Sequence, residues 1–204
     1  MLIIGLTGSI GMGKSTAAER FRQRGIAVFD ADAEVHRLYE GPMATVIEAA
    51  FPGTVRDGKV DRKELSRILV REPHRFSELE RIVHPRVRER EREFLRAEHQ
   101  RGAELAVLEI PLLLESKAGH MVDAIVVVSA GADIQRRRVL ARPGMTPEKL
   151  EELISRQMKD EEKRRHADFV VDTGGSVESC HAQVDAIIST LESRPGTAFE
   201  RHWR

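Results

Sequence analysis

The chain has 204 residues, which is enough to bury the core of one domain with a sizeable insertion or of two small domains. Its 33 lysine and arginine residues are balanced by 33 aspartate and glutamate residues, which excludes a general nucleic-acid surface. The sequence has no long apolar run for a membrane span, no signal segment at its start and a single cysteine, Cys180, so a cytoplasmic location is expected.

The first apolar run, residues 2–6, leads into a segment that fits the pattern G-x-x-x-x-G-K-[ST] from Gly8 to Ser15. A buried strand, a glycine-rich turn and a helix from about Lys14 are the context that this pattern requires. The glycines let several backbone N–H groups point at phosphate oxygens, and the positive end of the helix adds to their field. Lys14 can bridge the β- and γ-phosphates and Ser15 can hold Mg²⁺, so the segment predicts a nucleoside-triphosphate site.

A second strand is predicted at residues 26–29, after a helix over residues 15–24 that Gly25 ends. This strand runs into Asp30 and Asp32, and alternation along a strand would place both carboxylates on the same side. Ligands bind beyond the carboxyl ends of the strands in an open parallel sheet, so either carboxylate is a candidate for a general base or a Mg²⁺ partner. The alternative is that one of them only caps the next helix.

Residues 33–104 are too long for a simple crossover, because the next strand-like run begins only at residue 105. Helical patterns separated by turns fill this stretch, and they predict an inserted helical lobe in which His84 and Pro85 interrupt the helices. A phosphoryl-transfer enzyme would hold its acceptor in such a lobe, directly after the candidate base. The arginines of the lobe, taken singly, are more often solvated surface residues than ligands. The predicted helices are residues 34–51, 62–71, 73–83 and 85–101.

Three further strands and a helical lid are predicted in the second half of the chain. The strands are residues 105–110, 124–128 and 169–172. Residues 111–115, which begin with Pro111 and three leucines, are expected to form a wall over the active site. In the predicted lid, at about 136–160, Arg138 and Arg142 are four residues apart and therefore project from one helical face. A helical hairpin with arginines at its tip can close over a triphosphate and exclude water, whereas the alternative is a solvent-exposed basic turn.

Strands alternating with helices predict an α/β protein with a three-layer α/β/α fold and a five-stranded parallel sheet. Right-handed crossovers put the carboxyl ends of all the strands, and the motifs that follow them, at one edge. The predicted organisation is a nucleotide-binding core at residues 1–32 and 105–192, an inserted acceptor-binding lobe at 33–104 and a loose tail at 193–204.

Taken together, these motifs resemble the dephospho-coenzyme A kinase family. These are P-loop kinases that use ATP to phosphorylate the ribose 3′-hydroxyl of dephospho-coenzyme A, giving coenzyme A and ADP in the last step of coenzyme A synthesis. The resemblance extends from Leu2 to about Leu191, and the ordered set of motifs is far more specific than the phosphate loop alone. The segments that carry it are residues 5–15, 30–32, 84–85 and 111–115, Gln135 with Arg138 and Arg142, Arg156 with Gln157, and Ala167 with Asp168.

The resemblance implies a role for each candidate residue. Asp32 would be the catalytic base that faces the acceptor hydroxyl, while Lys14 and an arginine from the lid, Arg142, would act on the phosphates. Ser15 would hold Mg²⁺, and dephospho-coenzyme A would lie against the lobe at Asp32, His84 and Arg88. The residues implied to bind ATP are Gly11, Met12, Gly13, Lys14, Ser15, Thr16, Arg138 and Arg142.

The chain departs from the family's usual pattern in two places. Thr173 stands where the family often has Asn, in the segment after the fifth strand that faces adenine. Pro143 and Gly144 follow Arg142, where an acidic residue is frequent, so the mobility of the lid is expected to differ.

Three other functions were weighed against this one. Another P-loop kinase, for a nucleoside or nucleotide, would share the loop, the sheet and the lid but would bind its acceptor differently. A regulatory GTPase is disfavoured because the D-x-x-G pattern at residues 172–175 follows the last strand and no Asn-Lys-x-Asp segment exists. A nucleotide-binding module without chemistry would leave the carboxylates after the second strand idle.

Overall fold

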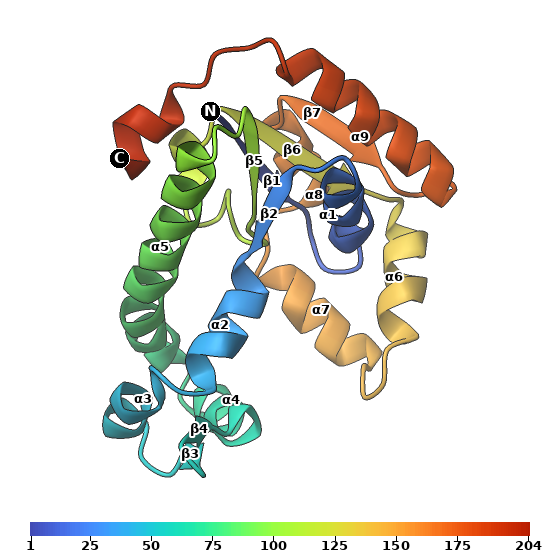
Figure 1. Ribbon diagram of the computed structural model, residues 1–204. Coiled ribbons are helices and arrows are strands. Elements are labelled where there is room, and N and C mark those ends of the chain that lie inside the picture. The colour runs from blue at the N-terminus through green and yellow to red at the C-terminus, as the bar shows by residue number, and fades with distance from the viewer. The chain divides into compact units, whose positions relative to one another are not determined.

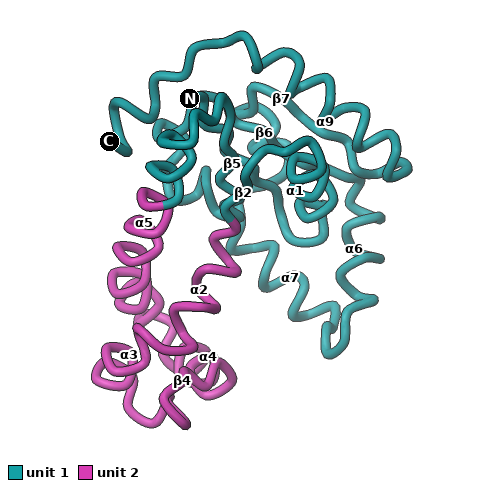
Figure 2. The backbone as a smooth tube through the Cα atoms, viewed as in Figure 1, with its two compact units in different colours: residues 1–29, 94–204 teal, residues 30–93 magenta.

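The computed structural model describes all 204 residues, which form two compact units (Figures 1 and 2). The first unit comprises residues 1–29 and 94–204, and the second comprises residues 30–93. The second unit ends before the predicted lobe does, because the long helix α5 (Phe76–Gln100) contributes residues to both units. No helix of the chain is both long and apolar enough to cross a bilayer.

A five-stranded sheet forms the centre of the first unit, and it confirms the predicted α/β fold with a parallel sheet. In spatial order the strands are β2 (Ala27–Asp30), β5 (Leu105–Glu109), β1 (Leu2–Thr7), β6 (Ala124–Ser129) and β7 (Phe169–Asp172). The central strand β1 runs parallel to both of its neighbours, so that Ile4 lies opposite Val107 on one side and Ala124 on the other. All residues of β1 are buried, as expected for a strand that is covered on both faces.

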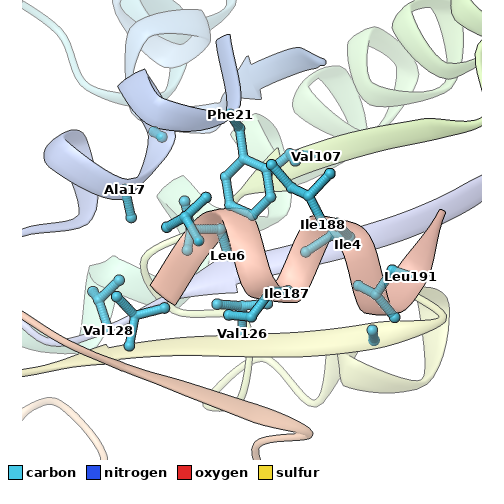
Figure 3. Packing of buried hydrophobic residues seen from close by; sticks show 14 of the residues in the cluster. Ile4, Leu6, Ala17, Phe21, Val107, Val126, Val128, Ile187, Ile188 and Leu191 are labelled. Atoms are coloured by element: carbon cyan, nitrogen blue, oxygen red, sulfur yellow. The ribbon is translucent and has the colours of Figure 1, made fainter. Parts of the chain in front are cut away.

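Helices α1 (Lys14–Gln23) and α9 (Val177–Leu191) pack together over this sheet (Figure 3). Phe21 of α1 and Ile188 of α9 are almost completely buried in the same cluster as Ile4 of β1. Burying one side chain of this size stabilises the fold by about 1.5–3 kcal/mol. Three other helices of this unit frame the candidate site: α6 (Ala132–Leu140), α7 (Pro147–Ser155) and α8 (Asp160–Arg165). Of these, α6 and α7 form the hairpin seen in Figure 1.

The second unit is mostly helical and has a hydrophobic core of its own. Its elements are α2 (Ala31–Tyr39), α3 (Ala44–Ala50), the short hairpin β3 (Val55–Arg56) and β4 (Lys59–Val60), α4 (Arg62–Arg71) and the first part of α5. Ile47 and Phe51 are fully buried in this core together with Leu65. The guanidinium of Arg75 lies over the ring of Phe51, 4.3 Å from its centre, which covers one edge of the core.

The helix α5 corrects one prediction, since the sequence was expected to break at His84 and Pro85. The structure has a single helix of 25 residues with Pro85 inside it. Proline has no N–H, so the carbonyl of Arg81 loses its usual partner, at a cost of about 3 kcal/mol. Val83 and Leu95, one on each side of the proline, are both buried, so the helix carries core side chains before and after this position.

The C-terminal segment, residues 193–204, was expected to be a loose tail, and this expectation is wrong. Trp203 is fully buried, and its indole N–H donates a hydrogen bond to the carbonyl of Met121 at 2.8 Å. The ring of Phe199 stacks on His99 at 4.2 Å between centres. The carboxylate of Asp123 also accepts a hydrogen bond from the backbone N–H of Ala198 at 2.8 Å. The segment packs because its two aromatic side chains find partners about a hundred residues earlier in the chain.

Replacing Trp203 by Ala should lower the free energy of unfolding by about 3–5 kcal/mol, because the change leaves a large cavity. Trp203→Phe is the matched control: it keeps most of the apolar ring and loses the bond to Met121, so it should cost about 1–2 kcal/mol. Urea unfolding followed by circular dichroism measures both changes. Unchanged stability of the Ala variant would contradict the packed C-terminus.

Candidate active site

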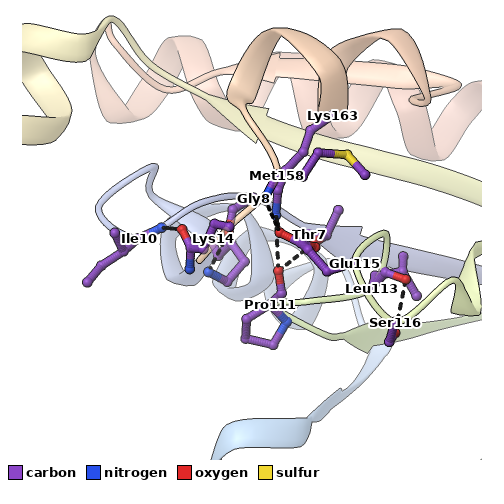
Figure 4. Close-up of polar contacts among 11 residues, drawn as sticks. Thr7, Gly8, Ile10, Lys14, Pro111, Leu113, Glu115, Ser116, Met158 and Lys163 are labelled. Atoms are coloured by element: carbon purple, nitrogen blue, oxygen red, sulfur yellow. Dashed lines mark hydrogen bonds and ion pairs between the residues drawn. The ribbon is translucent and has the colours of Figure 1, made fainter. Parts of the chain in front are cut away.

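The phosphate loop, residues 8–15, joins β1 to α1 and passes close to its neighbours. A Cβ atom at Gly8 would lie 2.4 Å from the side chain of Val128, so that position has room only for glycine. The ammonium group of Lys14 donates a hydrogen bond across the loop to the carbonyl of Gly8 at 2.9 Å (Figure 4). The backbone N–H groups of Gly11 and Gly13 have no hydrogen-bond partner in the chain. The loop therefore presents free N–H donors and one cation, which is the chemistry of an anion site.

The remaining residues of the predicted phosphate site begin helix α1. Lys14 is its first residue, Ser15 has an exposed side chain, and the backbone N–H of Thr16 donates to the carbonyl of Gly13 at 3.1 Å. Met12 is buried, and its N–H is bonded to the carbonyl of Ser9 at 3.1 Å, so this N–H is not open to a ligand in the structure.

Arg138 and Arg142, which were predicted to act together, lie in different surroundings. Arg138 is half-buried and donates to the carbonyl of Thr173 at 2.6 Å and to the carbonyl of Gly11 at 3.5 Å. Arg142 is exposed in the segment between α6 and α7, and its guanidinium has no ion-pair partner in the chain. Arg138 thus supports the loop from one side, while Arg142 is available to a ligand.

Thr173, which the sequence marks as a departure, lies beneath the phosphate loop. Its side chain is almost fully buried, and its hydroxyl donates to the carbonyl of Met12 at 2.8 Å. Arg138 donates to the same hydroxyl at 3.3 Å. Thr173, which was predicted to lie near adenine, therefore also contacts the predicted phosphate loop.

The sequence predicted that Asp30 and Asp32 lie on the same side of a strand, and this prediction is wrong. The strand ends at Asp30, whose carboxylate accepts a hydrogen bond from the N–H of Ala33 at 2.9 Å and so caps helix α2. Asp32 lies in the first turn of that helix with its side chain exposed. The alternative that Asp30 caps the next helix is thus confirmed. Asp32 lies in a helix, so the alternation of side chains along a strand does not apply to it.

His84 and Arg88, the predicted acceptor-binding residues, lie on one side of α5 in the second unit. They border an open cavity of about 540 Å³. Its lining residues are Ser77, Glu80, Arg81, His84, Pro85 and Arg88. The structure places Arg81, one of the arginines of the predicted lobe, beside these two residues.

Glu91 is a buried carboxylate that sequence reasoning missed. Only 3% of this residue is exposed, and Arg88 lies 3.3 Å from its Oε2 atom. Burial raises the pKa of Glu91 to about 7, while the positive charge of Arg88 lowers it by a smaller amount. The candidate ligand Arg88 therefore has a neighbour whose charge changes near neutral pH.

A fully buried lysine, Lys163, ties the predicted wall to helix α8 (Figure 4). Its ammonium group lies 2.8 Å from the carboxylate of Glu115 and 3.3 Å from the carbonyl of Pro111. The same carboxylate accepts the N–H of Met158 at 2.9 Å, and the hydroxyl of Thr7 donates to Pro111 at 3.0 Å. Nothing in the local sequence distinguishes Lys163 from a surface lysine, so this contact could not be predicted.

A second cavity, of about 400 Å³, opens at the carboxyl ends of β6 and β7. Met12 of the phosphate loop is one of its lining residues, with Asp160 and Arg164 of α8. The edge of the sheet that carries the loop is therefore also hollowed beside it, as expected for a ligand-binding edge.

The comparisons with known proteins place the chain in one family. The sequence profile described as Dephospho-CoA kinase matches residues 2–179. The chain belongs to the dephospho-CoA kinase family. The match includes the phosphate loop, the inserted lobe and the lid, so the family resemblance predicted from the motifs is confirmed.

Individual relatives of this dephospho-CoA kinase family member agree with the profile. Dephospho-CoA kinase of Rhizobium etli is 55% identical over 194 residues, which are 95% of this chain and 96% of that protein. A crystal structure from Thermus thermophilus has a TM-score of 0.80 at 37% identity and covers 93% of this chain and 97% of its own. Dephospho-CoA kinase from Campylobacter jejuni shares the fold, with a TM-score of 0.72 at 23% identity and coverage of 93% and 96%.

The raised pKa of Glu91 predicts a pH-dependent stability. A carboxyl group with a folded pKa of about 7 and an ordinary value of 4.5 binds its proton more tightly in the folded state. Its stabilising contribution is complete below pH 4.5 and is lost as the pH rises through 7. Glu91→Gln should therefore gain stability relative to the parent between pH 5 and pH 8, by up to roughly 3 kcal/mol.

Urea unfolding of both proteins at several pH values measures this difference. Glu89→Gln is the matched control, since Glu89 is exposed and pairs with Arg86 at 3.1 Å on the same helix. Identical pH profiles of the Glu91→Gln variant and the parent would rule out the titration.

Proposed function

We propose that the phosphate loop of this member of the dephospho-CoA kinase family holds ATP, and that its residues transfer the γ-phosphoryl group to the acceptor. The family's activity is phosphorylation of the ribose 3′-hydroxyl of dephospho-coenzyme A, the last step of coenzyme A synthesis, which gives coenzyme A and ADP. The observation that carries the proposal is the pair of free N–H groups at Gly11 and Gly13 beside Lys14. The buried thiol of Cys180 supports a cytosolic setting for this reaction.

ATP would lie on residues 11–16 with its phosphates at the N-terminal end of α1. Lys14, which donates to the carbonyl of Gly8 at 2.9 Å, would turn from this carbonyl to the β- and γ-phosphates. Binding at a helix N-terminus adds the favourable field of the helix to these hydrogen bonds.

Mg²⁺ would be held by the hydroxyl of Ser15 together with phosphate oxygens. This hydroxyl is exposed and has no hydrogen-bond partner in the chain, which fits an ion that takes most of its ligands from water and phosphate. No three His, Cys, Asp or Glu side chains lie together in a way that would hold a metal ion by themselves. When bound, the ion would offset the negative charge of the phosphates.

Asp32 would act as the general base. It would accept a hydrogen bond from the ribose 3′-hydroxyl and take the proton as the oxygen bonds to phosphorus. Asp30 is engaged in capping α2, so Asp32 is the carboxylate of the pair that is suited to this role.

The lid would contribute Arg142, and the lobe would hold the acceptor. Arg142 is exposed and lacks an ion pair, so it can meet the charge that develops on the transferring group. Arg138 would act closer to the loop, where it already contacts the carbonyl of Gly11. The cavity at His84 is lined by the guanidinium groups of Arg81 and Arg88, which suit the diphosphate of dephospho-coenzyme A.

Mass spectrometry of the product tests the proposed reaction. The protein is incubated with ATP, Mg²⁺ and dephospho-coenzyme A, and a parallel panel of nucleosides and nucleotides replaces the acceptor. We expect a mass gain of one phosphoryl group on dephospho-coenzyme A alone. Phosphorylation of a nucleoside or nucleotide instead would assign the chain to a different kinase activity.

Asp32→Asn should lower kcat by at least about 100-fold, because general-base catalysis is worth roughly that much or more. The affinity for ATP should stay within about threefold, since Asp32 is assigned to the acceptor. Asp30→Asn is the matched control: asparagine also caps helices, so this variant should keep nearly full activity. Steady-state kinetics measures both, and near-normal turnover of Asp32→Asn would remove Asp32 from the role.

A further inference from the structure

Besides Arg138, two buried side chains outside the phosphate loop donate to its carbonyl groups. Gln135 of α6 donates from Nε2 to the carbonyl of Ile10 at 2.8 Å. Thr173, which follows β7, donates from its hydroxyl to the carbonyl of Met12 at 2.8 Å. Both side chains are buried, with 7% of Gln135 and 5% of Thr173 exposed. These two bonds reach alternate residues of the loop from two separate elements.

Each bond fixes a neighbouring N–H group through the planar peptide bond. The carbonyl of Ile10 and the N–H of Gly11 belong to one peptide plane, as do the carbonyl of Met12 and the N–H of Gly13. The chain has no cis peptide bond, so in each plane the N–H points opposite to the carbonyl. Holding the carbonyl to one side therefore aims the N–H to the other side.

Neither of the two N–H groups aimed in this way is used inside the protein. The N–H of Gly11 and that of Gly13 have no partner, whereas the N–H between them, on Met12, bonds to the carbonyl of Ser9. Both glycines have positive φ angles, +77° and +82°, a region in which glycine rotates with little steric resistance. Without an outside donor, these peptide planes would be free to turn.

The direction of both bonds follows from the chemistry of the partners. A backbone carbonyl can only accept, so Gln135 must present its NH₂ group and Thr173 its O–H. Arg138 donates to the hydroxyl oxygen of Thr173 at 3.3 Å, which leaves the hydroxyl proton for a carbonyl. The carbonyl of Met12, at 2.8 Å, is nearer than that of Ser129, at 3.2 Å. The amide oxygen of Gln157 accepts the N–H of Ile10 at 3.1 Å, so the same residue of the loop is held at both of its polar atoms.

We propose that Gln135 and Thr173 are positioning residues for phosphoryl transfer: they aim the N–H groups of Gly11 and Gly13 at the phosphates of the nucleotide. The inference rests on the proposed ATP site and extends it. It gives Thr173 a function in phosphate binding, and it makes the first helix of the lid, through Gln135, a part of the phosphate site.

The test compares variants that keep or remove each donor. Thr173→Val keeps the shape and removes the hydroxyl, while Thr173→Ser keeps the hydroxyl. Gln135→Met keeps the length and removes the NH₂ group. ATP binding is measured by calorimetry without acceptor. Thr173→Val and Gln135→Met should each weaken it about 5- to 10-fold, which is the size expected for one hydrogen bond. Thr173→Ser should bind ATP within about twofold of the parent.

A residue-resolved measurement separates positioning from general destabilisation. In the parent protein labelled with ¹⁵N, ATP should shift the amide resonances of both Gly11 and Gly13. The shift of Gly13 should shrink in Thr173→Val while that of Gly11 persists, and Gln135→Met should show the reverse. A merely structural role would weaken both shifts equally or neither.

Two results would overturn the proposal. In the first, Thr173→Val and Gln135→Met bind ATP as tightly as the parent does. In the second, each variant loses the ATP-induced shifts of Gly11 and Gly13 to the same extent. If Thr173→Val does not fold, Gln135→Met and Gln135→Glu carry the test, since glutamate at this position faces the carbonyl without a donor. Failure of the parent to bind ATP would overturn the donor site and the proposal together, and this outcome is distinct from a failure in the variants alone.

Discussion

The close approach of the phosphate loop to the elements around it is the constraint on which the rest of the site depends. A Cβ atom would lie 2.4 Å from Val128 at Gly8 and 2.5 Å from Val139 at Gly11. The first of these neighbours is in β6 and the second in α6, so the loop is enclosed by parts of the chain that are made more than a hundred residues later. The shape of the loop is therefore set by its surroundings, and a nucleotide meets N–H groups that are already ordered.

A second constraint is the buried charge of Lys163. Removing one partner of a buried ion pair usually costs about 3–5 kcal/mol, because the other charge is left without compensation. Here the ammonium group contacts Glu115 and Pro111, and Thr7 at the end of β1 contacts the same proline. Polar contacts thus link the segment after β5 to helix α8 and to the start of the phosphate loop. Because these groups are buried, they have few other hydrogen-bond partners.

The parts of this protein that the sequence predicts are those that local chemistry determines. Short patterns of glycine, apolar and basic residues predict the phosphate loop, the strands of the sheet and the helical hairpin of α6 and α7. The start of helix α2 was predicted wrongly, because Asp30 is both the last residue of β2 and the cap of this helix. The interruption predicted at Pro85 was wrong for a different reason, since tertiary context can override the local preference of a residue. The helix continues through the proline and has buried side chains before and after it, at Val83 and Leu95.

Other features depend on partners that lie far apart in the chain, so no local pattern reveals them. Trp203 is ordered by Met121, and Lys163 by Glu115. Thr173 looks like a substitution in an adenine-facing segment until its contact with Met12 is seen. Motifs in the sequence identify candidate functional residues. The residues that hold them in place can be identified only once the fold is known.

The order of the strands in the sheet has a consequence for the synthesis of the chain. β1 is made first, yet its two neighbours begin only at Leu105 and Ala124. At about 5–20 residues per second, roughly 5–20 seconds pass before the first of them exists. Residues 30–93 are continuous and carry their own core, so they can fold in that interval. The apolar strand Leu2–Thr7 meanwhile has two open edges on the nascent chain, and it needs shielding from other chains until β5 and β6 have left the ribosome.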